Sequence, residues 1–300
     1  MRAVLAALRR YARADANVLI TGETGTGKDL AARTLHHLGP RHPHPFVVVD
    51  CPGLAASLLE AELFGHERGA FTDAGSARPS RFELAGEGTL YLDRVDELSL
   101  DAQAKLLRVV EQKQVERLGS TAAVPIRARI VASAADGVES AVRDGRFRMD
   151  LYHRLRVLPL FIPPLREHLE DVAPLVRYFL KRAAAAAGRA VPAISRDAAA
   201  ALGDYTWPGN VRELRHAIER AYQESDGDRI TLDHLPPEIL EAPALQPGPA
   251  LAQRPTLEDV ERRYIAATLR DVRGNQTEAA RILGISRKAL WEKRKRYGLD

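Results

Sequence analysis

The most constraining feature of this sequence is a glycine-rich stretch that directly follows the apolar run Val18–Ile20. A turn of this kind between a buried strand and a helix points successive backbone N–H groups at one place. A lysine and the positive end of the helix add charge there that favours phosphate. The helix-forming residues Asp29–Arg33 complete the context. We predict a loop that holds a nucleoside triphosphate through Gly22, Glu23, Thr24, Gly25, Thr26, Gly27, Lys28 and Asp29.

Two acidic positions, Asp29 and Asp93, indicate how magnesium would be bound. Asp29 stands where the general P-loop pattern has Ser or Thr, whose hydroxyl binds Mg²⁺, so the metal has to be held by something else. The apolar run Thr89–Leu92 ends in Asp93, an arrangement in which P-loop proteins hold Mg²⁺ or its waters beside the phosphates. A strand-ending aspartate that only caps the next helix is the alternative. We predict that Asp93 is the Walker B aspartate and binds Mg²⁺ together with the nucleotide.

Short apolar runs alternate with helical patterns through the first half of the chain. The predicted strands are Val18–Ile20, Phe46–Val49, Thr89–Leu92, Ile130–Ser133 and Val157–Phe161. Buried strands separated by helices predict an α/β fold: a mostly parallel sheet with helices on both faces and ligands at the carboxyl ends of the strands. Beyond Leu165 the pattern becomes helical, with candidate helices over 171–187, 195–202 and 210–224, and predicts a small helical lid.

The rest of the chain divides by composition. Residues 241–255 are rich in Pro, Ala and Gln without a hydrophobic period, and predict a linker. After it, helices are expected over 256–271, 276–283 and 286–297, with a turn at Gly284, which is helix-turn-helix spacing. We therefore expect a nucleotide-binding core over 1–165, a lid over 166–240, the linker 241–255 and an all-α helix-turn-helix domain over 256–300.

Composition limits the class of protein. With 300 residues, 45% of them hydrophobic, the chain is long enough for two or three globular domains. Its single cysteine, Cys51, excludes an internal disulfide framework and a clustered-cysteine metal site. No apolar run reaches the length of a membrane span, and we expect a cytoplasmic protein without a membrane partner. The net charge is only +4, but basic residues crowd into the last fifteen positions, which favours a nucleic-acid partner.

Several long motifs occur in one order along the chain. They are Gly65–Ala74, Gly88–Asp93, Phe147–Leu155, Pro163–Glu167 and Trp207–Leu214. Together these motifs resemble the AAA+ activators of sigma-54 RNA polymerase, the bacterial enhancer-binding proteins. The likeness extends to the C-terminal helix-turn-helix, which is similar to the Fis type, and spans nearly the whole chain.

The resemblance implies a homo-oligomeric ring ATPase, assembled from dimers, whose ATP lies between neighbouring subunits. Arg148 and Arg154 match the arginine-finger positions, where a guanidinium stabilises charge on a neighbour's γ-phosphate. Arg212 matches the lid arginine called sensor II. A surface salt bridge is the alternative role for each of these arginines.

The resemblance also assigns a partner contact. Gly69, Ala70, Phe71, Thr72, Asp73 and Ala74 match the loop that engages sigma-54. An exposed tip with one aromatic and one hydroxyl residue suits such a contact, and Phe71 and Thr72 are its expected centre. Asp73 stands where the family usually has glycine and adds a negative charge.

Three positions depart from the family pattern at the catalytic site. Arg94 follows Asp93 in place of the glutamate that orients or deprotonates the attacking water, and a guanidinium cannot accept a proton. Ala135 replaces the sensor I asparagine, and Asp50 replaces another asparagine and has the charge to form an ion pair with Arg94. Asp96 and Glu97 follow closely and are the residues that could substitute for the missing base, but both are expected in the turn beyond the strand, aimed away from the phosphate.

Two functions therefore stay open, and a third, an AAA+ motor that acts on DNA itself, is disfavoured by the sigma-54 contact loop. In one, the chain binds upstream DNA and remodels sigma-54 RNA polymerase at promoters through an ATP-driven AAA+ ring. In the other, the chain is a DNA-binding regulator whose AAA+ body is a hydrolysis-deficient scaffold, because Arg94 and Ala135 predict ATP binding with slow turnover or none. A usual member of the family carries an N-terminal receiver or sensor domain, which these residues do not contain. We therefore expect either external control or a longer parent chain.

The C-terminal segment carries the residues expected to bind double-stranded DNA. A recognition helix directs its first residues to base edges in the major groove and its basic residues to phosphates. The expected contacts are Ser286, Arg287, Lys288, Trp291, Lys293 and Arg294, with base reading assigned to Arg287 and Lys288. A solvated basic helix without a binding role is the alternative, and the Thr256–Asp271 helix is the expected dimer face.

Overall fold

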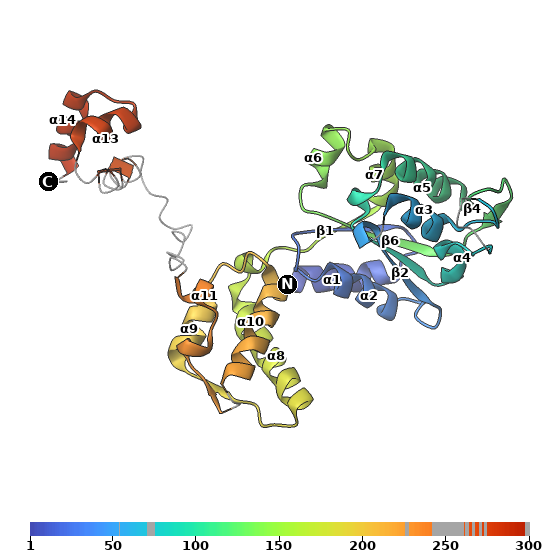
Figure 1. Cartoon of the computed structure of the whole chain (residues 1–300), viewed down its shortest axis with the longest axis horizontal. Coiled ribbons are helices and arrows are strands. Elements are labelled where there is room, and N and C mark those ends of the chain that lie inside the picture. The colour runs from blue at the N-terminus through green and yellow to red at the C-terminus, as the bar shows by residue number, and fades with distance from the viewer. Residues whose placement is uncertain are drawn as a thin grey trace. The chain divides into compact units, whose positions relative to one another are not determined.

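The computed structural model describes residues 1–53, 55–70, 76–225, 228–241, 261, 264–265, 268–269, 272 and 275–297. The chain divides into two compact units, Met1–Pro243 and Ala244–Asp300. The first unit contains a sheet and many helices, whereas the described part of the second is helical (Figure 1). Among the described residues, no helix has the length and apolar character needed to cross a membrane.

A five-stranded sheet with the order β2-β3-β6-β1-β7 forms the centre of the first unit. Its strands are β1 (Val18–Thr21), β2 (Phe46–Asp50), β3 (Thr89–Asp93), β6 (Arg129–Ala134) and β7 (Leu158–Phe161). All neighbouring strands are parallel, and their carboxyl ends therefore meet at one edge. The five predicted strands are confirmed within one or two residues at each end, and so is the parallel α/β fold.

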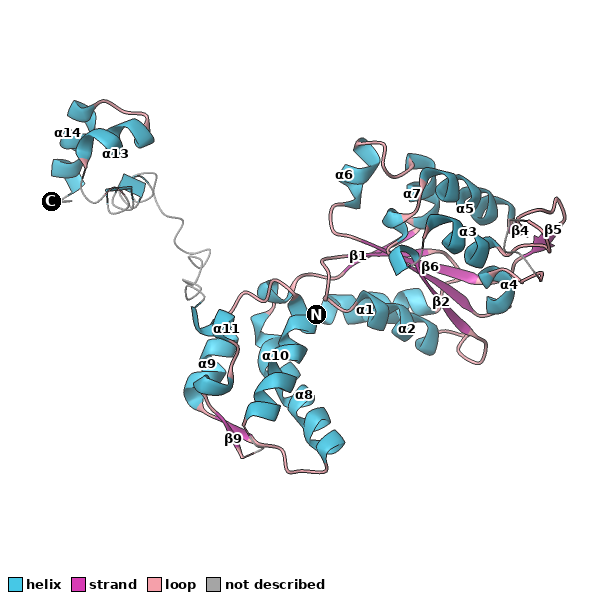
Figure 2. Ribbon diagram, in the orientation of Figure 1, coloured by secondary structure: helices cyan, strands magenta, loops and turns pink. Residues whose placement is uncertain are grey.

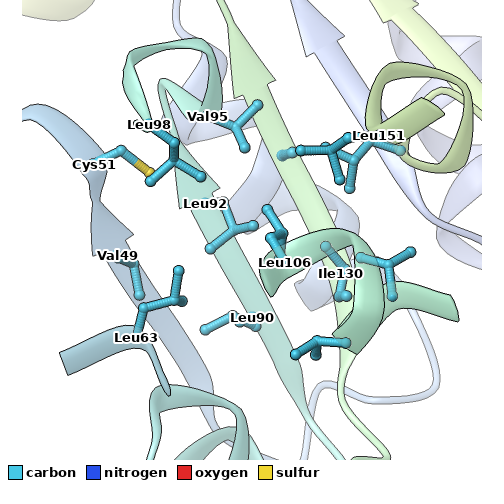
Figure 3. Close-up of a cluster of buried hydrophobic side chains, with 14 of the residues drawn as sticks. Val49, Cys51, Leu63, Leu90, Leu92, Val95, Leu98, Leu106, Ile130 and Leu151 are labelled. Atoms are coloured by element: carbon cyan, nitrogen blue, oxygen red, sulfur yellow. The ribbon is translucent and has the colours of Figure 1, made fainter. Parts of the chain in front are cut away.

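Helices cover both faces of the sheet, and the inner strands β1, β3 and β6 are therefore buried on both sides (Figure 2). Helices α1 (Arg2–Ala12) and α2 (Lys28–Leu38) share one apolar cluster with Ile20, Tyr91 and Val131. Helices α3 (Ala56–Phe64), α5 (Leu100–Gln112) and α7 (Met149–Leu155) pack on the other face. Figure 3 shows the core of that second face, where Leu90, Leu92 and Ile130 lie among Leu63, Leu106 and Leu151.

Shorter elements connect these helices and strands. They are η1 (Cys51–Gly53), α4 (Arg81–Ala85), η2 (Val95–Glu97), β4 (Gln114–Glu116), β5 (Ala123–Pro125) and α6 (Val138–Arg143). The antiparallel pair β4–β5 was not predicted, because strands of three residues with at most one buried side chain carry almost no periodic signal.

The lid follows β7 in the same unit. Its helices are α8 (Val172–Ala187), α9 (Arg196–Asp204), α10 (Asn210–Glu224) and α11 (Pro237–Glu241), with short elements η3 (Leu165–Glu167), η4 (Leu169–Asp171), β8 (Ala193–Ile194), β9 (Arg229–Ile230) and η5 (Leu232–His234). Trp207 is fully buried at the centre of the lid's apolar cluster. The three helices predicted for this region are confirmed within one or two residues of their bounds.

The second unit contains α13 (Gln276–Leu283) and α14 (Arg287–Tyr297). Asn275 caps α13 by accepting a hydrogen bond from the N–H of Glu278, and Gly284 ends the helix in the left-handed region at φ 65°. Both helices and the turn are confirmed as predicted. Most of the predicted linker 241–255 and part of the predicted helix 256–271 lie outside the described residues, and the domain boundaries remain predictions.

Candidate functional site

The glycine-rich loop leaves β1 at the carboxyl edge of the sheet and leads into α2. Gly22, Gly25 and Gly27 all have positive φ, at 148°, 84° and 99°. A Cβ on Gly25 would lie 2.2 Å from the carbonyl oxygen of Gly209, and one on Gly22 would lie 2.6 Å from that of Ile162. Only glycine fits these two positions, because the conformation and the space both exclude a side chain.

Lys28 lies at the inner rim of this loop. Its ammonium group donates hydrogen bonds to the carbonyl oxygens of Gly22 at 2.5 Å and Glu23 at 3.0 Å. Burial lowers the pKa of Lys28, while the nearby carboxylates of Asp93 and Asp96 act to raise it. The cation therefore lies partly desolvated beside the end of β3, where a phosphate would strengthen its interactions.

The carboxylate of Glu23 connects the loop to the lid. Arg166 donates two hydrogen bonds to it, at 2.8 and 2.6 Å, and the side-chain amide of Asn210 donates a third at 3.1 Å. The same amide donates to the carbonyl of Thr24, and the N–H of Arg212 donates to that of Gly25. Glu23 is thus placed to fix the loop on the lid, a role that the motif alone did not indicate.

We expect this contact to weaken at low pH. The hydrogen bonds from Arg166 and then Asn210 lower the pKa of Glu23 from its ordinary 4.5 to about 2. Because the folded pKa is depressed, the stabilisation is fully present above about pH 4.5 and is lost as the pH falls towards 2. Glu23→Gln should lower the free energy of unfolding by about 1.5 to 3 kcal/mol at pH 7, the range for hydrogen bonds to charged groups.

This prediction is checked by urea unfolding of the wild type and Glu23→Gln between pH 7 and 3. The difference between the two proteins should shrink as the pH falls below 4.5. Glu224→Gln is the matched control, because Glu224 forms an exposed i,i+4 pair with Arg220 in the lid and should change stability by less than about 0.5 kcal/mol. A constant difference across this pH range would contradict the assigned contact.

Two acidic side chains, Asp93 and Asp29, bear on where Mg²⁺ would be held. Asp93 ends β3, and its Oδ1 accepts hydrogen bonds from Tyr91 at 2.9 Å and Ser133 at 2.5 Å. Its Oδ2 has no hydrogen-bond partner among the described residues, which suits a metal or a metal-bound water. Asp29 instead binds Arg33 at 2.9 Å on the exposed side of α2. Asp93 therefore fits the Mg²⁺ role, and Asp29 supplies a helix-surface ion pair.

Arg94 is engaged by the neighbouring strand. Its guanidinium donates to Asp50 Oδ1 at 3.1 Å, which confirms the ion pair expected from the two substitutions. Arg94 adopts φ 57°, in the left-handed region, and its N–H donates to Ser133 Oγ at 2.9 Å. Ala135, at the sensor I position, offers only its backbone N–H, which donates to Asp96 Oδ2 at 3.1 Å. Asp96 lies in the turn beyond β3, as expected, and this hydrogen bond fixes it against the end of β6.

The three arginines implied by the resemblance lie in different places. Arg148 occupies the position just before α7 and forms an exposed ion pair with Asp150 at 2.8 Å. Arg154 lies on α7 and binds Glu111 at 2.9 Å. Exposed pairs of this kind cost little to break, so neither guanidinium is held firmly by its partner. Arg212 lies on α10 and, with Thr24, lines a groove of about 520 Å³ between the loop and the lid.

The predicted sigma-54 loop is only partly described. Gly69 and Ala70 belong to the described residues, whereas Phe71, Thr72, Asp73 and Ala74 lie outside them. Its base is fixed by bridges from His66 to Arg78 and Leu118. Arg117 binds Glu67 at 3.0 Å and Glu83 at 2.6 Å, and these hydrogen bonds raise the pKa of Arg117.

Arg117 and Glu83 hold this base although the sequence analysis did not identify them. The hydrogen bond from Arg117 is the main cause that lowers the pKa of Glu83. Glu83 also completes a capping box with Ser80 at the start of α4, so the S-x-x-E pattern was the signal that marked it.

The predicted DNA contacts divide into two groups. Arg287, Lys288 and Trp291 are exposed on α14, and Ser286, also exposed, directly precedes the helix. Lys293 is half-buried and forms an ion pair with Glu261 at 2.6 Å, and Arg294 is half-buried as well. Lys295, absent from the prediction, lies over the Trp291 ring at 5.4 Å, and the i,i+4 spacing of the two residues is the signal that could have found it.

Lys293 therefore contributes to the packing of the second unit. Glu261 also accepts a hydrogen bond from the Tyr297 hydroxyl at 2.6 Å. The hydrogen bond from Lys293 is the main cause that lowers the pKa of Glu261, and the one from Tyr297 is the next. Ile265, Ala279, Ala280 and Leu290 form the buried apolar cluster beneath. The first residues of α14 remain the exposed basic surface.

Family models match three consecutive segments of the chain. The sigma-54 interaction domain matches residues 1–161, the AAA+ ATPase lid domain matches 166–250, and the bacterial regulatory protein Fis family matches 256–297. The fold is that of an AAA+ P-loop protein: a parallel sheet with a glycine-rich loop at its carboxyl edge, followed by a helical lid. The C-terminal helix-turn-helix is of a type found in DNA-binding regulators. The chain belongs to the sigma-54 interaction domain family, whose members include sigma-54-dependent transcriptional activators.

Known proteins are similar over almost the whole chain. The transcriptional regulatory protein ZraR of Klebsiella oxytoca is 44% identical over 98% of this chain and 66% of its own length, and the regulatory protein AtoC of Escherichia coli is 42% identical over 97% and 64%. The crystal structure of NtrX from Brucella abortus in complex with ATP has a TM-score of 0.74 and 35% identity, covering 99% of this chain and 67% of that one. The chain thus spans just under two thirds of these two regulators.

Proposed function

We propose that this chain binds ATP with Mg²⁺, assembles into a homo-oligomeric ring, and binds upstream double-stranded DNA to remodel sigma-54 RNA polymerase at promoters. The observation that carries the proposal is the position of Lys28, partly desolvated on the loop carbonyls and within electrostatic reach of Asp93. A cation and a metal-binding carboxylate at the same sheet edge are the two charges that a bound triphosphate needs. The ATP complex of the similar NtrX structure supports the choice of nucleotide.

Each part of the site has a distinct role in this proposal. The loop Gly22–Gly27 and Lys28 bind the phosphates, and Asp93 holds Mg²⁺, which would neutralise phosphate charge when bound. Arg212 binds the nucleotide from the lid, while Arg148 and Arg154 reach the site of a neighbouring subunit. Residues 69–74 contact sigma-54, and α14 enters the major groove through Arg287 and Lys288.

A second candidate function follows from the pair of Arg94 and Asp50. Arg94 occupies the position from which a carboxylate would activate water, and its guanidinium is bound to Asp50. A site that keeps its phosphate contacts but lacks a base at this position would bind ATP and assemble without ordinary turnover. The AAA+ body would then serve as a scaffold for a DNA-binding regulator.

One preparation of the full chain distinguishes the two candidates. We expect calorimetry to detect binding of ATP with Mg²⁺. Phosphate release is then measured on the same sample, with and without sigma-54 polymerase and promoter DNA. Release stimulated by assembly, together with open promoter complexes, is expected for the motor, and binding without release is expected for the scaffold. Failure to bind ATP or a non-hydrolysable analogue would exclude both.

A further inference from the structure

The turn after β3 holds a carboxylate that the predicted catalytic set does not use. Asp96 lies in η2, between Val95 and Leu98, which are 0% and 4% exposed and point into the apolar core in Figure 3. These two anchors fix the turn and leave Asp96 at the carboxyl edge of the sheet. There its Oδ2 accepts a hydrogen bond from the N–H of Ala135, at the end of the adjacent strand β6.

The other carboxylate oxygen of Asp96, Oδ1, is less well satisfied. Oδ1 is buried and forms no hydrogen bond within the described part of the chain. A buried carboxylate oxygen without a donor costs roughly 1 to 3 kcal/mol, or more because the group is charged, so such an atom calls for a specific explanation. A water molecule that donates to Oδ1 would satisfy it.

The charge of Asp96 also acts on the phosphate-binding lysine. After Asp93, Asp96 is the carboxylate that most raises the pKa of Lys28 against the effect of burial. Arg94 is occupied by Asp50, and the methyl group of Ala135 cannot form a hydrogen bond, so neither side chain provides an acceptor at this edge. Asp96 therefore keeps an unused carboxylate oxygen beside the sensor I position, while Asp93 is the carboxylate assigned to Mg²⁺.

We propose that Asp96 is a catalytic residue that orients and deprotonates the water attacking the γ-phosphate of ATP. The inference rests on the proposed function, because it requires ATP in the loop next to Lys28. It assigns the base of this chain to a position two residues beyond Arg94, held by the backbone N–H of Ala135 instead of by a side chain.

The reaction balances with water as the second substrate. The water oxygen forms a bond to the γ-phosphorus, and the bond from that phosphorus to the β,γ-bridging oxygen breaks, leaving its electron pair on ADP. The water proton passes to Oδ1 of Asp96 and then to the released phosphate or to solvent. The products are ADP and inorganic phosphate, and Asp96 returns to its ionised state.

The test compares Asp96→Asn with Asp136→Asn in the full chain. Asparagine at 96 keeps an oxygen to accept from Ala135 but cannot take a proton, and we expect phosphate release to fall about 100-fold or more. Asp136 is the matched control: it is exposed, its charge also acts on Lys28, and it should change release by less than about threefold.

Nucleotide affinity gives a second readout that does not depend on turnover. Removing the charge of Asp96 should tighten binding of a non-hydrolysable ATP analogue relative to ADP, because Asp96 would face the γ-phosphate that ADP lacks. The change should exceed that of Asp136→Asn. If Asp96→Asn fails to bind nucleotide, Asp96→Glu provides the test instead. This variant keeps the negative charge but displaces the carboxylate by one methylene, so phosphate release should still fall.

The outcomes separate this inference from the proposed function. A wild type that binds no ATP removes the proposed function itself. A wild type that binds ATP but releases no phosphate in any assembly state overturns the role of Asp96 and leaves the scaffold. Equal turnover of the wild type and Asp96→Asn, or equal shifts in ATP-analogue and ADP affinity, also overturns it.

Discussion

Lys28→Ala is expected to weaken binding of ATP and its non-hydrolysable analogues by at least about 100-fold. The lysine is the cation held at the inner rim of the loop, and a charge-assisted hydrogen bond in a partly desolvated site is worth about 3 kcal/mol, which corresponds to that factor. The measurement is calorimetric titration of the full chain with an ATP analogue and Mg²⁺.

Arg33→Ala is the matched control for this prediction. Arg33 is a cation on the same helix, but it is exposed and pairs with Asp29, so its loss should change affinity by less than about threefold. Similar losses in both variants would mean that α2 contributes only a general positive field. Unchanged affinity in Lys28→Ala would place the nucleotide somewhere other than the loop.

The local parts of the phosphate site were predictable from the sequence. The positive-φ glycines, the strand before them and Asp93 all follow from patterns within a few residues. The Asp50–Arg94 pair was also predictable, because each of the two substitutions changes the charge at positions that the family places together.

Contacts between distant segments were not predictable in the same way. Glu23 belongs to the loop motif, yet its partners Arg166 and Asn210 lie 143 and 187 residues further along the chain. Asp96 binds a backbone N–H, a group present at every position except proline, and only the pairing of β3 with β6 selects Ala135. Likewise, a run of basic residues does not reveal that Lys293 faces Glu261.

The lid should lose much of its stability in Trp207→Ala. Trp207 is fully buried, its indole N–H donates to the carbonyl of Leu202 at 3.0 Å, and its ring lies edge-on to Tyr205 at 5.0 Å. Truncating a buried tryptophan typically costs about 3 to 5 kcal/mol, because the cavity left behind closes only in part. Hydrogen exchange of peptides from α8, α9 and α10 should report a lower opening free energy by this amount.

Tyr178→Ala is the matched control, since Tyr178 is an aromatic residue of the same lid that is 54% exposed. Its loss should change the opening free energy by less than about 1 kcal/mol.

The effect of Trp207→Ala should extend to the candidate nucleotide site. Asn210, which binds Glu23, begins α10 only three residues after Trp207, and its N–H donates to the Trp207 carbonyl. A lid that opens more often releases the loop from this contact, so ATP-analogue affinity should fall together with lid protection. Loss of protection without loss of affinity would show that the loop keeps its binding conformation without the lid.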